Sequence, residues 1–147
     1  MNIEPRVGVG EVRFGMTLEE VLAVLGEPEW SGYDSEGDAE RRWPNLTVRW
    51  GRETETVAEI AVPVENRVTI AGHLLPLDSD PLTVLCELDP EPVRCLGFLI
   101  FREIGVAISG FHDGDEDQRA LTVFAPGRWD DMSSHFEPFT SKGGGAG

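Results

Sequence analysis

The chain has 147 residues, of which 40% are hydrophobic and four are tryptophan, a composition that excludes wholesale disorder. It carries 27 Asp and Glu against 12 Lys and Arg, and the net charge of −15 argues against direct binding to nucleic acid or to anionic membranes. No apolar run is long enough to span a membrane, and the first residues lack the basic and apolar parts of a signal peptide, so we expect a cytoplasmic protein.

The first strong pattern is a short helix with a signal at each end, over residues 17–25. Thr17 is a good N-cap, and Glu20 stands three residues later, where its side chain can complete a capping box. Gly26 suits the position just past the helix, and Pro28 prevents the helix from resuming. The expected core face of the helix consists of Leu18, Val21, Leu22 and Leu25.

The stretch from Val12 to Pro28, which reads VRFGMTLEEVLAVLGEP, resembles the opening of the BamE/SmpA family and of the β-lactamase-inhibitor-like proteins. The resemblance implies a small α+β module that binds other proteins. BamE-type proteins are exported and anchored to lipid at an N-terminal Cys, whereas the first Cys here is Cys86. The resemblance therefore implies the module and not the envelope role.

A second version of the same plan follows the first. The first half has a lead-in, the helix and then strands at 43–50 and 57–62. The second half has a lead-in at 68–75, a helix that begins after Asp80 and Pro81, and strands at 96–101, 104–109 and 119–124. We expect repeats at residues 1–64 and 65–127, followed by a tail at 128–147 that is flexible after about residue 140.

Alternation in residues 43–50 divides the side chains between two faces of a strand. Leu46, Val48 and Trp50 share the face that we expect the helices to cover, which leaves the opposite face open. Trp and Arg are frequent interface anchors, and the resemblance to β-lactamase-inhibitor-like proteins implies that an aromatic sheet face grips a partner. The alternative is that Trp43 is buried under the 30–40 loop or the tail. The predicted partner-binding residues are Trp43, Asn45, Thr47, Arg49 and Glu59.

Both faces of the strand at 96–101 are apolar, so something must cover the outer one. One candidate is the tail, which carries Trp129, Met132, Phe136 and Phe139, and dimerisation is the other. The protein is therefore expected to be a monomer or a homodimer.

Catalytic and cofactor motifs are absent from the sequence, because the three His are isolated and no glycine-rich phosphate or dinucleotide fingerprint is complete. Asp113, Asp115 and Asp117 resemble the start of a calcium loop. However, Gln118 stands where that loop needs Gly, and Phe124 stands where it needs a bidentate Glu. A solvated hairpin loop is the better interpretation, and the three carboxylates are weak metal candidates only.

These patterns predict an α+β fold, made of two tandem helix-plus-antiparallel-sheet repeats packed as one unit with the helices on one side of the sheet. The expected function is a protein-binding module, inhibitory or immunity-like, with a basic protein as partner and with no cofactor. The alternatives are a small hydrolase or metal-dependent enzyme with a dispersed acidic and His site, and a ligand-sensing module. The acidic charge also has a simpler explanation, which is that it keeps a small protein soluble.

Overall fold

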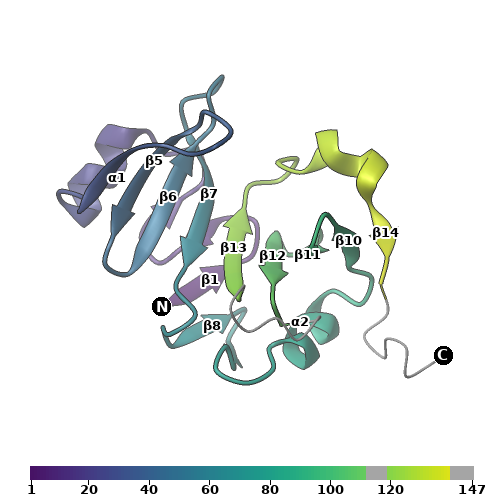
Figure 1. Cartoon of the computed structure of the whole chain (residues 1–147). Helices are drawn as coiled ribbons and strands as arrows, with labels where there is room; N and C mark the ends of the chain where they lie inside the picture. The colour runs from purple at the N-terminus through teal and green to yellow at the C-terminus, as the bar shows by residue number, and fades with distance from the viewer. Residues whose placement is uncertain (112–118, 140–147) are drawn as a thin grey trace.

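The computed structural model describes residues 1–111 and 119–139, which form two β-sheets and three short helices (Figure 1). The smaller sheet has five strands in the order β3-β2-β1-β8-β9, and β1 and β8 pair in parallel at its centre. Its strands are β1 (Asn2–Glu4), β2 (Gly8–Val9), β3 (Val12–Arg13), β8 (Val68–Ile70) and β9 (His73–Leu75).

The larger sheet has nine strands in the order β14-β10-β11-β12-β13-β7-β6-β5-β4, and every pair is antiparallel. The first half of the chain contributes β4 (Trp30–Tyr33), β5 (Ala39–Trp43), β6 (Leu46–Trp50) and β7 (Val57–Val62). The second half contributes β10 (Val93–Cys95), β11 (Phe98–Phe101), β12 (Val106–Ser109) and β13 (Ala120–Phe124), and the tail adds β14 (Glu137–Pro138). The two four-stranded runs meet where β7 pairs with β13.

The helices are α1 (Leu18–Leu25), α2 (Leu82–Leu88) and the 3-10 helix η2 (Asp130–His135). The predicted capping box of α1 is confirmed, since the Thr17 hydroxyl accepts from the Glu20 amide and the Glu20 carboxylate accepts from the Thr17 amide. Gly26 follows the helix with a φ of 79°, a conformation that glycine adopts without steric cost. Asp80 accepts from the Leu82 amide and so caps the start of α2, although α2 begins at Leu82 rather than at Pro81.

The main core lies between the two sheets. Strands of the smaller sheet supply buried Ile3, Val9 and Ile70, and these pack in one cluster with the inner face of the larger sheet. Val21 is the fully buried residue of α1, while the other three residues of its predicted core face are partly buried against the same cluster. The sheet that we did not expect thus provides much of the core.

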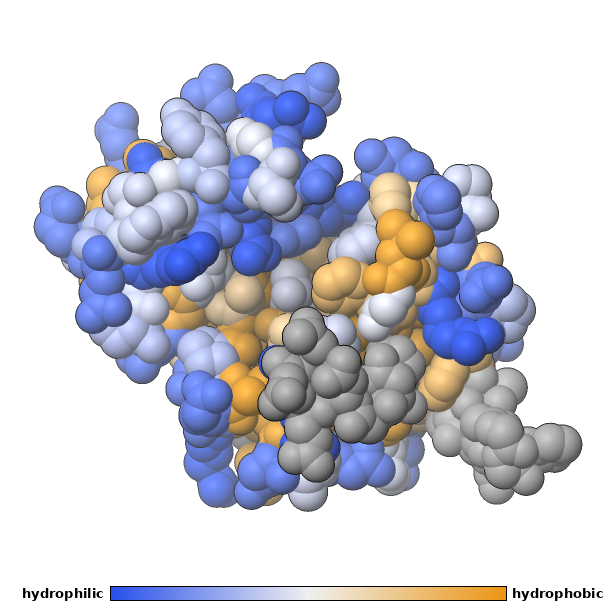
Figure 2. All heavy atoms as spheres, viewed as in Figure 1, coloured by the Kyte–Doolittle hydropathy of each residue, from blue (hydrophilic) through white to orange (hydrophobic). Residues whose placement is uncertain are grey.

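The outer face of the larger sheet has an apolar half and a polar half. Over β10–β13, the outward side chains form a second cluster that includes Ile100 and Phe124, and Trp129, Met132 and Phe136 of the tail pack on it. Of the two candidates for covering this face, the tail is the one seen in the structure, except that Phe139 packs against the main core. Figure 2 shows hydrophilic residues dominating the end of the molecule that carries α1 and β4–β6, and hydrophobic residues gathering in the middle of the view and right of centre, inside a hydrophilic rim.

The predicted fold class is wrong. Strands make up 39% of the structure and helices 16%, and there are two sheets rather than two helix-plus-sheet repeats with helices on one side. The reason is that the expected lead-ins at 8–14 and 68–75, together with β1, pair into a sheet of their own. Helices of eight and seven residues are roughly 10–12 Å long. They cannot cover nine strands that extend over about 38 Å at the usual spacing.

Within the part of the chain that the structure describes, no helix has the length and apolar character needed to cross a membrane.

Candidate functional site

The polar half of the outer face is built from alternate residues of β5, β6 and β7. Glu40 lies directly opposite Arg49, and Arg49 lies opposite Glu59. Directly opposite residues of antiparallel strands point to the same face, so three strands place these charged side chains in one row.

These side chains form a chain of alternating charges that we call the ion-pair network. Arg49 donates from Nε to Glu40, at 2.8 Å, and from a terminal nitrogen to Glu59, at 2.9 Å. Arg128, from the loop after β13, donates from Nε to Glu59 at 3.0 Å and also binds Asp38. Within the described residues, the network consists of Arg42, Glu40, Arg49, Glu59, Arg128, Asp38 and Arg52, together with Asp34, which lies 3.7 Å from Arg49.

Glu40 is the most enclosed carboxylate of the network, with 2% of its surface exposed. Burial by itself would raise the pKa of Glu40, but hydrogen bonds from Arg49 and from Arg42 outweigh it and hold that pKa below its ordinary value. Burial likewise opposes the charge of Arg49, and its bonds to Glu40 and Glu59 raise the pKa of that guanidinium. These pKa shifts favour the charged forms of both Glu40 and Arg49.

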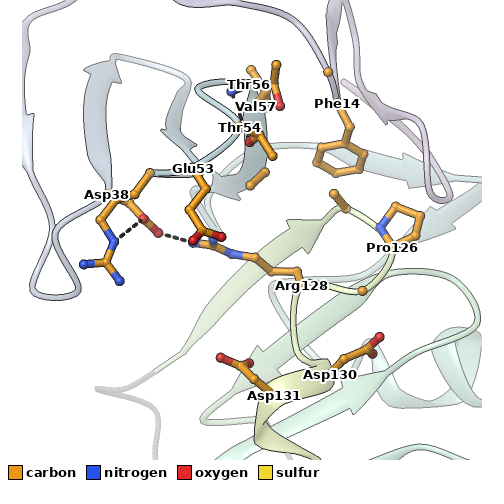
Figure 3. Close-up of a pocket in the computed structure, with 16 residues that line it drawn as sticks. Phe14, Asp38, Glu53, Thr54, Thr56, Val57, Pro126, Arg128, Asp130 and Asp131 are labelled. Atoms are coloured by element: carbon orange, nitrogen blue, oxygen red, sulfur yellow. Dashed lines mark hydrogen bonds and ion pairs between the residues drawn. The ribbon is translucent and has the colours of Figure 1, made fainter.

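A cleft of about 900 Å³ opens beside the network (Figure 3). It lies between the turn that follows β6 and the loop that leads from β13 into η2, so both halves of the chain line it. Arg128 extends across it toward Asp38, with Glu53 above and Asp130 and Asp131 below in the view of Figure 3.

The cleft offers a ligand no free cation among its described lining residues, although its exposed carboxylates Glu53, Asp130 and Asp131 are in no ion pair of the described structure. Its two arginines, Arg52 and Arg128, are already paired with Asp38. Among the described residues, no group of three or more His, Cys, Asp or Glu is arranged to hold a metal ion. Its chemistry is mainly that of a structural salt-bridge site joining the β13–η2 loop to β5 and β7.

Trp43 does not lie on the outer face, and the expectation that it is exposed there is wrong. β5 ends at Trp43 and β6 begins at Leu46, so a two-residue turn separates positions that we had counted along one strand. Trp43 pairs with Leu46 and shares its inner face. It is 8% exposed, and its Nε1 donates to the Gly26 carbonyl at 3.0 Å, which ties the sheet to the end of α1.

The other predicted partner-binding residues are divided between the turn and the outer face. Asn45 is exposed in the turn, where its carbonyl accepts from the Asn66 side chain. Thr47, Arg49 and Glu59 do share the outer face, and the last two are partners of each other. Their role in binding stays a prediction. The weak metal candidates Asp113, Asp115 and Asp117 lie outside the described residues.

Two features near β4 were missed. β4 is the edge strand of the larger sheet, and it exposes Trp30 (40%) and Tyr33 (74%). The surrounding residues 14–40, which we call the acidic segment, contain no Lys or Arg. Its carboxylates are Glu19, Glu20, Glu27, Glu29, Asp34, Glu36, Asp38 and Glu40.

Some carboxylates of the acidic segment are neutralised by arginines, and others are not. Asp38 and Glu40 are buried within the ion-pair network, and Asp34 approaches Arg49. Within residues 1–111 and 119–139, no ion pair engages the four exposed residues Glu19, Glu27, Glu29 and Glu36. Counting Lys and Arg in a moving window, rather than over whole halves of the chain, would have found this segment.

Comparison with protein-family models, with curated proteins and with solved structures yields no significant match to this chain.

Proposed function

We propose that this chain is a protein-binding module that engages a basic protein through its acidic segment, as an inhibitor or immunity protein would. The observation that carries the proposal is the presence of four unpaired, exposed carboxylates in the acidic segment, three of which lie within three residues of the exposed Trp30 or Tyr33 in the sequence. Along β5, β6 and β7, by contrast, Glu40, Arg49 and Glu59 neutralise one another.

Each part of this surface contributes something different to binding. Unpaired carboxylates of one sign attract a basic protein over a distance and raise the association rate, an effect that salt screens. Aromatic side chains supply apolar contact area at low cost in conformational entropy, and Trp and Tyr are enriched among the residues that dominate binding energy. A partner that neutralises these carboxylates also relieves part of the repulsion caused by the net charge of −15.

The test begins with the whole chain as bait, followed by purification of the captured protein and measurement of its association rate at low and at physiological salt. We expect a basic partner whose association slows as salt is added. A variant with Glu19, Glu27, Glu29 and Glu36 all changed to Gln should associate about tenfold more slowly at low salt, within the range known for electrostatic steering.

The matched control changes four exposed glutamates of the second half to Gln and alters the net charge by the same amount. It should slow association less than twofold, because those carboxylates are not part of the acidic segment. Equal effects of the two variants would show that only total charge matters, and a captured partner without basic character would contradict the proposal. The control residues are Glu65, Glu87, Glu91 and Glu103.

A further inference from the structure

The larger sheet has two outer edges, and only one of them is protected in the described structure. The four-stranded runs meet at β7 and β13, so the first strand of each run, β4 or β10, falls at the outside. The tail returns and pairs β14 with β10, and β14 carries Pro138, which has no N–H to offer a further strand. Within the described residues, no strand pairs with the free side of β4.

The backbone of β4 presents pairing groups to solvent. The Asp34 N–H donates to the Asp38 carbonyl at 2.9 Å, which identifies these two residues as a hydrogen-bonded pair. Such pairs alternate along an antiparallel ladder, so Gly32 and Trp30 also bond toward β5. The N–H and C=O groups of Ser31 and Tyr33 therefore point to the open side.

The usual protections of an edge strand are missing from β4. Natural edges are blunted by Lys, by Pro or by a bulge, but β4 reads WSGY and pairs with β5 without a register shift over its four residues. Pro28 and the extra bond from the Glu29 N–H to the Arg42 carbonyl lie just before the strand. Ser31 and Tyr33, the two residues whose backbone is free, are exposed.

Side chains on both faces of β4 could hold the side chains of an added strand. On the outer face, the Trp30 ring lies over Gly32, where a Cβ would come within 2.4 Å of it, and Arg42 stacks on the ring at 4.3 Å. On the inner face, Tyr33 borders a hollow of about 280 Å³ that Leu18 and Trp50 also line. Strand addition commonly takes its affinity from the main chain and its specificity from such flanking pockets.

The charge around β4 indicates which kind of segment can pair with its open side. Glu27 and Glu29 precede the strand and Glu36 follows it, and none of the three is in an ion pair of the described structure. The nearest cations are on β5, where Arg42 is paired with Glu40 and Arg41 donates to the Gly32 carbonyl. A second copy of this chain would bring an identical acidic edge against the first, and like charges in paired strands are destabilising. We propose that β4 is a docking edge that binds an extended, Lys- and Arg-rich segment of a partner protein by strand addition, an inference that rests on the proposed function.

The experiment uses a defined probe, a ten-residue peptide of alternating Lys and Val with blocked ends, added to the full chain at low salt. We expect the exchange of the Ser31 and Tyr33 amide protons, followed by NMR, to slow at least tenfold when the peptide saturates the protein. The same peptide carrying N-methyl groups along its central residues keeps its charge but cannot donate to β4, and it should bind at least tenfold more weakly.

Two protein variants with the same change in charge locate the site. Ser31→Lys places a cation on the open edge, and Ser35→Lys places one in the exposed turn after β4. Both residues are exposed, and the amide spectrum of each variant shows whether the fold is kept. Ser31→Lys should weaken peptide binding at least tenfold, and Ser35→Lys less than threefold.

Each contrary outcome has a distinct meaning. Equal weakening by the two variants, or undiminished binding of the N-methylated peptide, would overturn the edge site while leaving a basic partner in place. Failure of the peptide to bind at all would also overturn the edge site as a docking edge for a basic segment. So would slowed amide exchange of Ser31 and Tyr33 in the protein alone at high concentration, because the occupant of the edge would then be a second copy of the chain. The proposed function fails separately, when the whole chain captures no basic protein.

Discussion

Glu40→Gln is the sharpest test of the ion-pair network. Glu40 accepts from Arg49 at 2.8 Å and from Arg42 at 2.7 Å while only 2% exposed. Glutamine preserves the shape of the side chain but replaces one acceptor oxygen by an NH₂ group, which must then face an arginine donor. Hydrogen bonds to charged groups contribute about 1.5–3 kcal/mol each, and breaking a buried ion pair costs about 3–5 kcal/mol.

The expected loss of unfolding free energy is about 2–4 kcal/mol. This loss is smaller than the summed free energies of the two hydrogen bonds for two reasons. Arg49 remains bonded to Glu59, and Arg42 is half exposed, so water can hydrate its guanidinium. At about 2–4 °C per kcal/mol for a chain of this length, the midpoint of thermal unfolding should fall by roughly 4–16 °C. Glu29→Gln, at an exposed position, should change the free energy by less than about 0.5 kcal/mol.

The assay is urea unfolding of the two variants and the wild type between pH 3 and pH 7. Because the pKa of Glu40 is lower in the folded protein, its stabilisation is complete above the unfolded-state value of about 4.3 and is lost as the pH falls through the folded-state value. The difference between wild type and Glu40→Gln should therefore be full at pH 6–7 and shrink below about pH 4. A loss under about 1 kcal/mol at pH 7, or one that persists unchanged at pH 3, would refute the reasoning.

Four further substitutions test the helix cap and the packing. Val21→Ala, at a fully buried position, should cost about 2 kcal/mol or more, and Thr17→Ala, which removes the cap of α1, about 1 kcal/mol; urea melts in the opposite order would contradict the assigned core face. Trp43→Phe removes the bond to the Gly26 carbonyl and should cost about 1–3 kcal/mol, with faster amide exchange at the end of α1 as its specific sign. Trp129→Ala uncovers the outer cluster and should increase the binding of a hydrophobic dye, and a variant that binds no more dye than wild type would show that the tail is not the cover.

Helix α1 was predictable because everything that defines it is local. The Thr17 and Glu20 cap, the apolar spacing that contains Val21, and Gly26 at the end lie within ten residues. The strand at 57–62 was predicted at the bounds that β7 has, for the same reason. The smaller sheet was not predictable in this way, because β1 pairs with β8 across more than sixty residues and each of its strands is only two or three residues long.

The prediction for Trp43 was wrong because alternation was counted through a turn, and not because of the residue types. Alternation over 46–50 was read correctly, since Leu46, Val48 and Trp50 are all buried. Pro44 lacks the N–H that a central strand needs, and it signals that the strand cannot continue through it. A two-residue turn at 44–45 reverses the chain, so Trp43 returns to the inner face beside Leu46.

The tail explains why the two ends of the larger sheet differ, and why a sequence alone could not identify the open one. Trp129 and Phe136 hold the tail on the apolar outer cluster, and this attachment carries Glu137 and Pro138 to the side of β10. The polar outer face beside β4 has no such cluster to attract a covering segment, because the ion-pair network occupies it. The same difference in side-chain chemistry that closes one edge thus leaves the other available, and the acidic segment restricts what can pair there. Edge status depends on strand order and on the path of the tail, and neither property is encoded within the four residues of β4.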